Sequence, residues 1–146
     1  MFMQGQLIFS DSDDVAGAAD AAIATLATWL QITNGDAPAN VLGISFTPAQ
    51  NCIIIARVTL RAKHSVVGAN MYLGVSVNDV VAKQVDFPYM NSASVNQSKN
   101  LTYKFDGVAG TAYSIKGLFY NATAGTITIG RVAAVTWMDV EAYATP

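Results

Sequence analysis

His64 and Cys52 are the first candidates for nucleophilic or acid–base chemistry, since each is the only residue of its type in the chain. They lie twelve positions apart in one segment that reads as a strand, too far along its axis to touch. A lone histidine at the polar end of a strand is typically a solvent-exposed loop residue. A cysteine beside three isoleucines is typically a buried apolar residue. We therefore predict no catalytic residues and no enzymatic activity.

The acidic run Ser10–Asp14 is the first candidate for metal binding. It has the composition of a calcium loop but lacks the glycine and the distal glutamate of the roughly twelve-residue motif. A zinc site needs about three or four His, Cys or carboxylate ligands, which this sequence can barely supply. The glycines stand singly at turns, so no phosphate-binding loop is present. We predict no metal and no cofactor, and expect the acidic run to cap a following helix.

Aromatic side chains are the remaining candidates, because exposed rings beside Asn, Gln and Asp would suit a sugar. They are spread over many segments, which favours packing in a core or a subunit interface, with a carbohydrate platform as the alternative. The residues concerned are Tyr72, Tyr89, Tyr103, Tyr113, Phe119, Tyr120, Trp137 and Tyr143.

The overall composition points to an oligomer. The 146 residues fit one domain, and 52% are hydrophobic while only 12% are charged, about half the usual charged fraction. Depletion of charge is typical of the core of a subunit interface. A monomer with an unusually apolar core is the alternative. The net charge of −2 and the scattered basic residues argue against nucleic-acid binding.

The sequence contains no membrane-spanning stretch, because no run of about 18 apolar residues occurs. Its start lacks the positively charged region of a secretion signal and turns acidic instead. Together with the single cysteine, this suits synthesis in a reducing cytoplasm. We expect no membrane partner.

The elements that would position any site are strands. Residues 56–63 and 71–77 alternate apolar and polar side chains, Asn78-Asp79 marks a turn, and Pro48 and Pro88 end further apolar runs. About eight short strands with turn signals every 8 to 14 residues are the pattern of an antiparallel sandwich or barrel.

The N-terminal part differs from the rest. Residues 15–27 are rich in alanine and place apolar residues near helical spacing, which predicts a short helix, although Leu26, Leu30 and Ile32 also fit one face of a strand. We therefore divide the chain into an N-terminal arm with a possible short helix, 1–28, and a β-sandwich domain, 29–146. The arm combines acidic residues with apolar anchors, and its predicted partner contacts are Phe2, Leu7, Ile8 and Phe9.

Three segments together resemble a known family: "WLQITNGDAPANVLGISFTPAQNCIIIARVTL", "MYLGVSVNDVVAKQVDF" and "AYSIKGLFYNATAGTITIGRVAAVTWMDVEAY". Over residues 29–144 they are similar to the small jelly-roll (TNF-like) modules of tailed-bacteriophage structural proteins. The resemblance implies an all-β, antiparallel jelly-roll sandwich of about eight strands. It is carried by the order of the elements rather than by one motif.

The same resemblance implies a role in the virion, usually as a trimer. Such modules serve as capsid decoration (cement) proteins, as fibre tips or as receptor-binding domains. The absence of a heptad repeat for a fibre shaft favours a decoration protein that binds the major capsid protein on the capsid surface after synthesis in the host cytoplasm. A fibre tip or receptor-binding domain for a host glycan is the alternative. A carbohydrate-active enzyme ranks last, because no acid pair can be argued.

Overall fold

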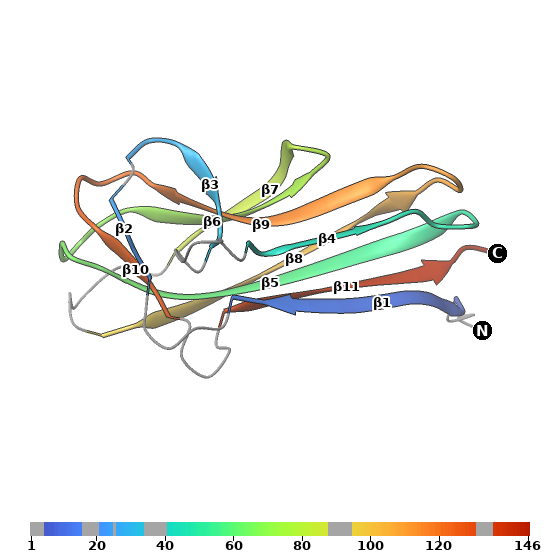
Figure 1. Cartoon of the computed structure of the whole chain (residues 1–146), viewed down its shortest axis with the longest axis horizontal. Coiled ribbons are helices and arrows are strands. Elements are labelled where there is room, and N and C mark those ends of the chain that lie inside the picture. The colour runs from blue at the N-terminus through green and yellow to red at the C-terminus, as the bar shows by residue number, and fades with distance from the viewer. Residues whose placement is uncertain (1–4, 16–20, 25, 34–40, 88–94, 131–135) are drawn as a thin grey trace.

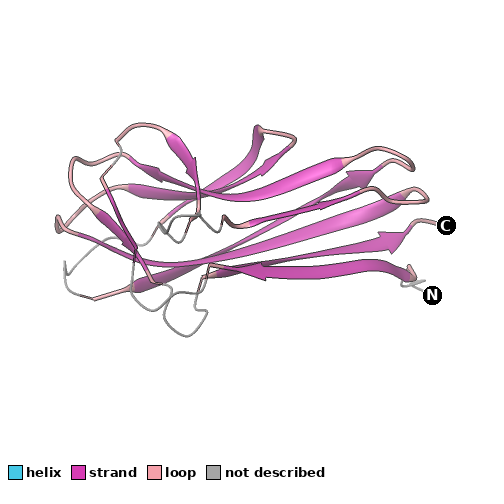
Figure 2. Ribbon diagram, in the orientation of Figure 1, coloured by secondary structure: helices cyan, strands magenta, loops and turns pink. Residues whose placement is uncertain are grey.

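The computed structural model describes residues 5–15, 21–24, 26–33, 41–87, 95–130 and 136–146. These residues form eleven strands and no helix, arranged as two antiparallel sheets packed face to face (Figures 1 and 2). The all-β sandwich predicted from the alternating segments is therefore confirmed. No helix among the described residues is long and apolar enough to span a membrane.

The first sheet, called sheet A, is built around the long strand β5. Strand β11 pairs with one edge of β5 and β8 with the other, and β1 pairs with the far side of β11. Strand β10 continues the line of β11 along β5, and β2 pairs with β10. The strands are β1 (Leu7–Asp14), β2 (Ala21–Ile23), β5 (Cys52–His64), β8 (Gln97–Gly107), β10 (Ile127–Ile129) and β11 (Trp137–Ala144).

The second sheet, called sheet B, is built around β9 and β6. Strand β7 pairs with the far side of β6 through a two-residue turn, while β3 and β4 pair with successive parts of β9. The strands are β3 (Trp29–Gln31), β4 (Gly43–Phe46), β6 (Met71–Val77), β7 (Val80–Asp86) and β9 (Tyr113–Asn121). The turn residues Asn78 and Asp79 have φ angles of 50° and 66°, as a tight hairpin requires.

The eleven strands occupy eight rows, because β1 and β2, β3 and β4, and β10 and β11 each share a row. Numbered along the chain, the rows follow the order 1-8-3-6 in sheet A and 2-7-4-5 in sheet B. This is the connectivity of a jelly roll, in which successive rows along the chain alternate between the two sheets except at the hairpin of rows 4 and 5. The expected count of about eight strands agrees with the rows.

The core lies between the sheets and is mostly aliphatic. Ala56, Val58, Leu60 and Ala62 of β5 face inward and are at most 1% exposed, as the alternating pattern predicts. Met71, Leu73 and Val75 of β6 face them from sheet B. Cys52 is buried at the start of β5, also as predicted. Burial of these side chains is the main stabilising contribution to the fold.

The predicted helix at 15–27 is wrong where the structure describes it. Ala21–Ile23 is a strand that pairs with Ile127–Ile129, and residues 16–20 and 25 lie outside the described residues. Alanine intrinsically favours a helix, but the pairing of this segment with the edge of β10 overrides that propensity. The expected cap at Ser10–Asp14 is also wrong, because these residues belong to β1.

Strand β1 links the two sheets at one side of the sandwich. Oδ2 of Asp13 accepts a hydrogen bond from the backbone N–H of Gly43 in β4, at 2.9 Å. The ring of Phe9 stacks on that of Phe46, with centroids 4.1 Å apart and planes 7° from parallel. Strands β1 and β2, which lie within the predicted N-terminal arm 1–28, together form the first row of sheet A.

Candidate functional site

Three of the predicted partner contacts, Leu7, Ile8 and Phe9, begin β1 at the end of the sandwich where β11 ends (Figure 1). Leu7 is 49% exposed, while Ile8 and Phe9 are half-buried and pack against the core. Phe2 lies outside the described residues. Of the three described contacts, Leu7 therefore presents the most apolar surface to a partner.

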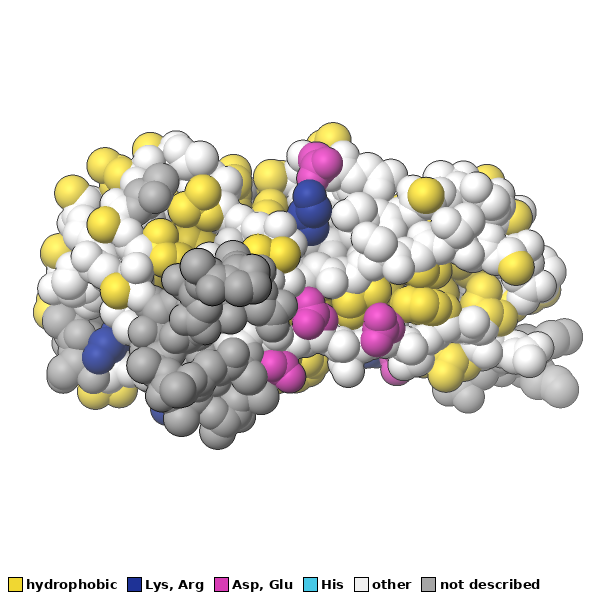
Figure 3. Space-filling model, viewed as in Figure 1, with side chains coloured by type: hydrophobic (Ala, Val, Ile, Leu, Met, Phe, Trp, Pro, Cys, Tyr) yellow, Lys and Arg dark blue, Asp and Glu magenta, His cyan; other side chains and the backbone are white. Residues whose placement is uncertain are grey.

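The hollow beside these residues and the two loops next to it carry no charged side chain. A hollow of about 230 Å³ is lined by Ile8, Phe9, Phe46, Thr47, Pro48, Ala49 and Gln50. The neighbouring loops 47–51 and 108–112 contain no charged residue. In Figure 3, the visible side chains at this end are yellow or white, with an apolar strip running between the two sheets. We call this surface the uncharged end.

A second candidate site lies on the outer face of sheet B, where three aromatic side chains stand in one row across the strands. Trp29 of β3 is paired with Tyr120 of β9, and Tyr120 with Tyr72 of β6. The ring centroids of Trp29 and Tyr120 lie 5.3 Å apart and those of Tyr72 and Tyr120 5.8 Å apart. With Gln84 and Ala122 they line a hollow of about 380 Å³, which we call the aromatic hollow.

Gly74 determines how this hollow is shaped. It faces outward on β6, and a Cβ atom there would lie only 2.6 Å from Cζ3 of Trp29. The indole therefore lies across the backbone of β6 in a space that only glycine leaves open. Gln84 is the cross-strand partner of Gly74, and its side chain lines the hollow together with that of Trp29.

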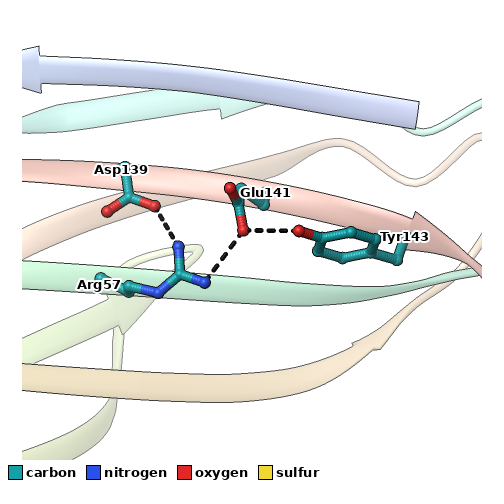
Figure 4. Close-up of polar contacts among 4 residues, drawn as sticks. All are labelled: Arg57, Asp139, Glu141 and Tyr143. Carbon is teal, nitrogen blue, oxygen red and sulfur yellow. Dashed lines mark hydrogen bonds and ion pairs between the residues drawn. The ribbon is translucent and has the colours of Figure 1, made fainter. Parts of the chain in front are cut away.

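The outer face of sheet A carries a charged cluster instead (Figure 4). Arg57 donates to Asp139 at 2.5 Å and to Glu141 at 3.0 Å, and the hydroxyl of Tyr143 donates to Glu141 at 2.9 Å. The Tyr143 hydrogen bond, followed by that of Arg57, lowers the pKa of Glu141. The same carboxylate raises the pKa of Tyr143 and, as the main cause, that of Arg57. Both carboxylates are thus held by hydrogen-bond donors from β5 and β11, in one network across the outer face of the sheet.

His64 is not the solvent-exposed residue that its position suggested. It is fully buried, and its Nε2 lies 3.0 Å from Oδ1 of Asn121 and 3.1 Å from the carbonyl oxygen of Thr123. Cys52 lies at the other end of β5, and burial raises the pKa of its thiol. The two residues are thus held apart, as the spacing predicted. Among the described residues, no group of three or more His, Cys, Asp or Glu side chains could hold a metal ion.

The aromatic candidates divide between the core and the surface. Tyr113 and Phe119 are buried in the core, Tyr103 packs against it, Trp137 is 38% exposed, and Tyr89 lies outside the described residues. Tyr72 and Tyr120, which the sequence places in separate segments, lie together in the aromatic hollow. Trp29 was missed, because it stands in a segment too short to show an alternating pattern.

No protein-family model matches the chain, and no curated protein matches it. Solved structures with the same kind of fold include dimeric latent PorU from Porphyromonas gingivalis, which is 9% identical with a TM-score of 0.53. The match covers 95% of this chain but only 12% of that one. At this identity, the likeness shows the fold alone.

Two further solved structures align with almost the whole chain at lower TM-scores. A family 35 carbohydrate binding module from an environmental isolate is 18% identical, with 99% of this chain and 96% of that chain covered and a TM-score of 0.43. The structure of infectious bursal disease virus Gt strain is 11% identical, with 96% and 42% covered and a TM-score of 0.40.

Proposed function

We propose that this protein is a virion structural protein of a tailed bacteriophage, a capsid decoration (cement) protein that binds the assembled lattice of the major capsid protein. It acts without catalysis, as a homotrimer, on the outer surface of the capsid after synthesis in the host cytoplasm. The jelly-roll connectivity, and the resemblance of residues 29–144 to phage structural modules, support this role.

The uncharged end is the observation that carries the proposal. It combines the exposed side chain of Leu7 with the hollow formed by Phe9, Phe46 and Pro48, and the loops beside it contain no charge. A surface of this kind binds through apolar burial, which salt does not screen. Binding only to the assembled lattice would stabilise that lattice by mass action.

Particles with and without the protein provide the test. We expect particles that lack it to release their genome at a lower temperature and to adsorb to host cells normally. Leu7→Asp should reduce binding to such particles, because it places a charge on the uncharged end, and Val67→Asp is the matched control. Val67 is 56% exposed in the loop that follows β5, at the opposite end of the sandwich. An unchanged release temperature together with lost adsorption would contradict the proposal.

Recognition of a host glycan by a fibre tip or receptor-binding domain is the second candidate, and the aromatic hollow favours it. An open hollow lined by three aromatic rings and an amide is suited to a small polar ligand with apolar faces. The adsorption measurement on particles lacking the protein separates the two roles.

A further inference from the structure

We propose that the outer face of sheet B binds a neutral glycan at two adjoining subsites that share Tyr72. This inference develops the second candidate function and is independent of capsid binding through the uncharged end. It rests on the arrangement of side chains across β3, β9, β6 and β7.

The first subsite is the aromatic hollow. Trp29, Tyr120 and Tyr72 form a continuous row of half-exposed rings rather than a closed cluster in the core. Pyranose rings present C–H groups on one or both faces, and these pack on aromatic rings while the hydroxyl groups around the edge remain free for hydrogen bonds. Gln84 is exposed at the border of the hollow and offers both a donor and an acceptor to such hydroxyls.

The second subsite continues the row towards the edge of the sheet. Tyr72 is paired with Asp86 of β7, and a hollow of about 210 Å³ beside Tyr72 is lined by Ala69, Asn70, Met71, Asp86 and Phe87. Asp86 and Asn70 are polar groups at the end of an aromatic row, placed to bond the hydroxyls of a second sugar unit.

The charges of the residues that line the two hollows favour a neutral glycan over an acidic one. No lysine or arginine is among the described residues that line either hollow, and Asp86 would repel a carboxylate. The lysines of the neighbouring strands are engaged elsewhere. Lys83 donates to the carbonyl oxygen of Thr102 on sheet A, and Lys116 is paired with Asp79 at the hairpin. Sialylated and uronic acid-containing glycans should therefore bind worse than neutral hexose glycans.

Gly74 acts as a positioning residue for this site. Because a Cβ atom would collide with the indole of Trp29, Gly74→Ala should move the ring from its place while leaving every ring present. If this variant loses glycan binding while its secondary structure is unchanged, binding depends on the position of the indole. A nonspecific hydrophobic patch would not show this dependence.

The test uses the full chain carrying Trp137→Phe, so that Trp29 is the only one of the two tryptophans left to report fluorescence. A printed array of neutral and acidic glycans identifies the best ligand, which is then titrated against Trp29 fluorescence and by calorimetry. We expect saturable binding of a neutral glycan, weakened about tenfold or more by Tyr120→Ala, Gln84→Ala and Gly74→Ala. Tyr143→Ala, on the outer face of sheet A, is the matched control and should bind normally.

Three results would overturn the inference: no neutral glycan bound on the array, tighter binding of acidic glycans, or an affinity in the Gln84→Ala and Tyr120→Ala variants equal to that of the native protein. Because Gln84 is exposed, its variant tests the site even if a tyrosine variant fails to fold. A failure of glycan binding would not affect the particle-stability test of the cement role, and a failure of that test would not affect the glycan-binding experiment.

Discussion

Nε2 of His64 and Oδ1 of Asn121 lie 3.0 Å apart, and both residues are fully buried. Nε2 also faces the carbonyl oxygen of Thr123, while Nδ1 accepts a hydrogen bond from the backbone N–H of Val66 at 3.0 Å. Both neighbours of Nε2 are acceptors, so the geometry assigns the proton to Nε2. The single histidine thus connects the end of β5 to the end of β9 and to the loop that follows it.

His64→Ala should destabilise the protein by about 1–3 kcal/mol, because the buried side chain of Asn121 and the backbone N–H of Val66 lose their partner. Urea denaturation of both proteins measures the free energy of unfolding. The matched control is Lys63→Ala, the neighbouring position on the outer face of β5, for which we expect a change within about 0.5 kcal/mol. Equal stability of the His64 variant and the native protein would refute the structural role.

Phe9→Ala should also destabilise the protein, by about 1–3 kcal/mol, since it removes a half-buried ring and its stack on Phe46. That stack joins the edge strands of the two sheets, so β1 should also exchange its amide hydrogens faster. Hydrogen exchange and thermal unfolding measure the two effects. Leu7→Ala is the control: it alters exposed surface and should leave protection of β1 unchanged.

Acid should weaken the protein through Glu141. Its pKa is lowered in the folded state, first by Tyr143 and then by Arg57, so the carboxylate stabilises the fold above the ordinary glutamate range of about 4.3. This contribution is lost as pH falls through the lowered pKa. Glu141→Gln should therefore be less stable than the native protein at pH 7, and the difference should shrink at pH 3.

Tyr143→Phe is the matched variant for this pH dependence, because it keeps the carboxylate and removes one donor to it. The acid-dependent loss should be smaller in this variant than in the native protein. A stability difference between native protein and Glu141→Gln that is the same at pH 7 and pH 3 would contradict the assignment.

The protein should be an oligomer in solution. Its charged fraction of 12% and the exposed apolar side chains of Leu7, Val80, Val95 and Val108 leave apolar surface for contacts between copies. Size exclusion with light scattering should give the mass of three protomers. A mass near 15.4 kDa at micromolar concentration would contradict the prediction.

Strands with one apolar and one polar face could be predicted from the sequence. Strands that form only because a distant segment pairs with them could not. Ala56, Val58 and Leu60 alternate with polar residues and face the core as expected. Ala21–Ile23 carries no such pattern, and its strand exists because β10 offers an unpaired edge. His64 looked exposed because its partner Asn121 lies on another sheet, and the aromatic hollow was hidden because its rings come from three strands.

The row order of sheet A has a consequence for synthesis on the ribosome. Strand β5 pairs along one side with β8 and along the other with β11, and both follow it in the chain. A nascent chain therefore exposes the apolar residues and the thiol of β5 until translation reaches β11, and sheet A cannot form stepwise as strands emerge. Folding in the cell should start only after almost the whole jelly roll has left the exit tunnel, and chaperones that bind extended apolar segments should meet β5 first.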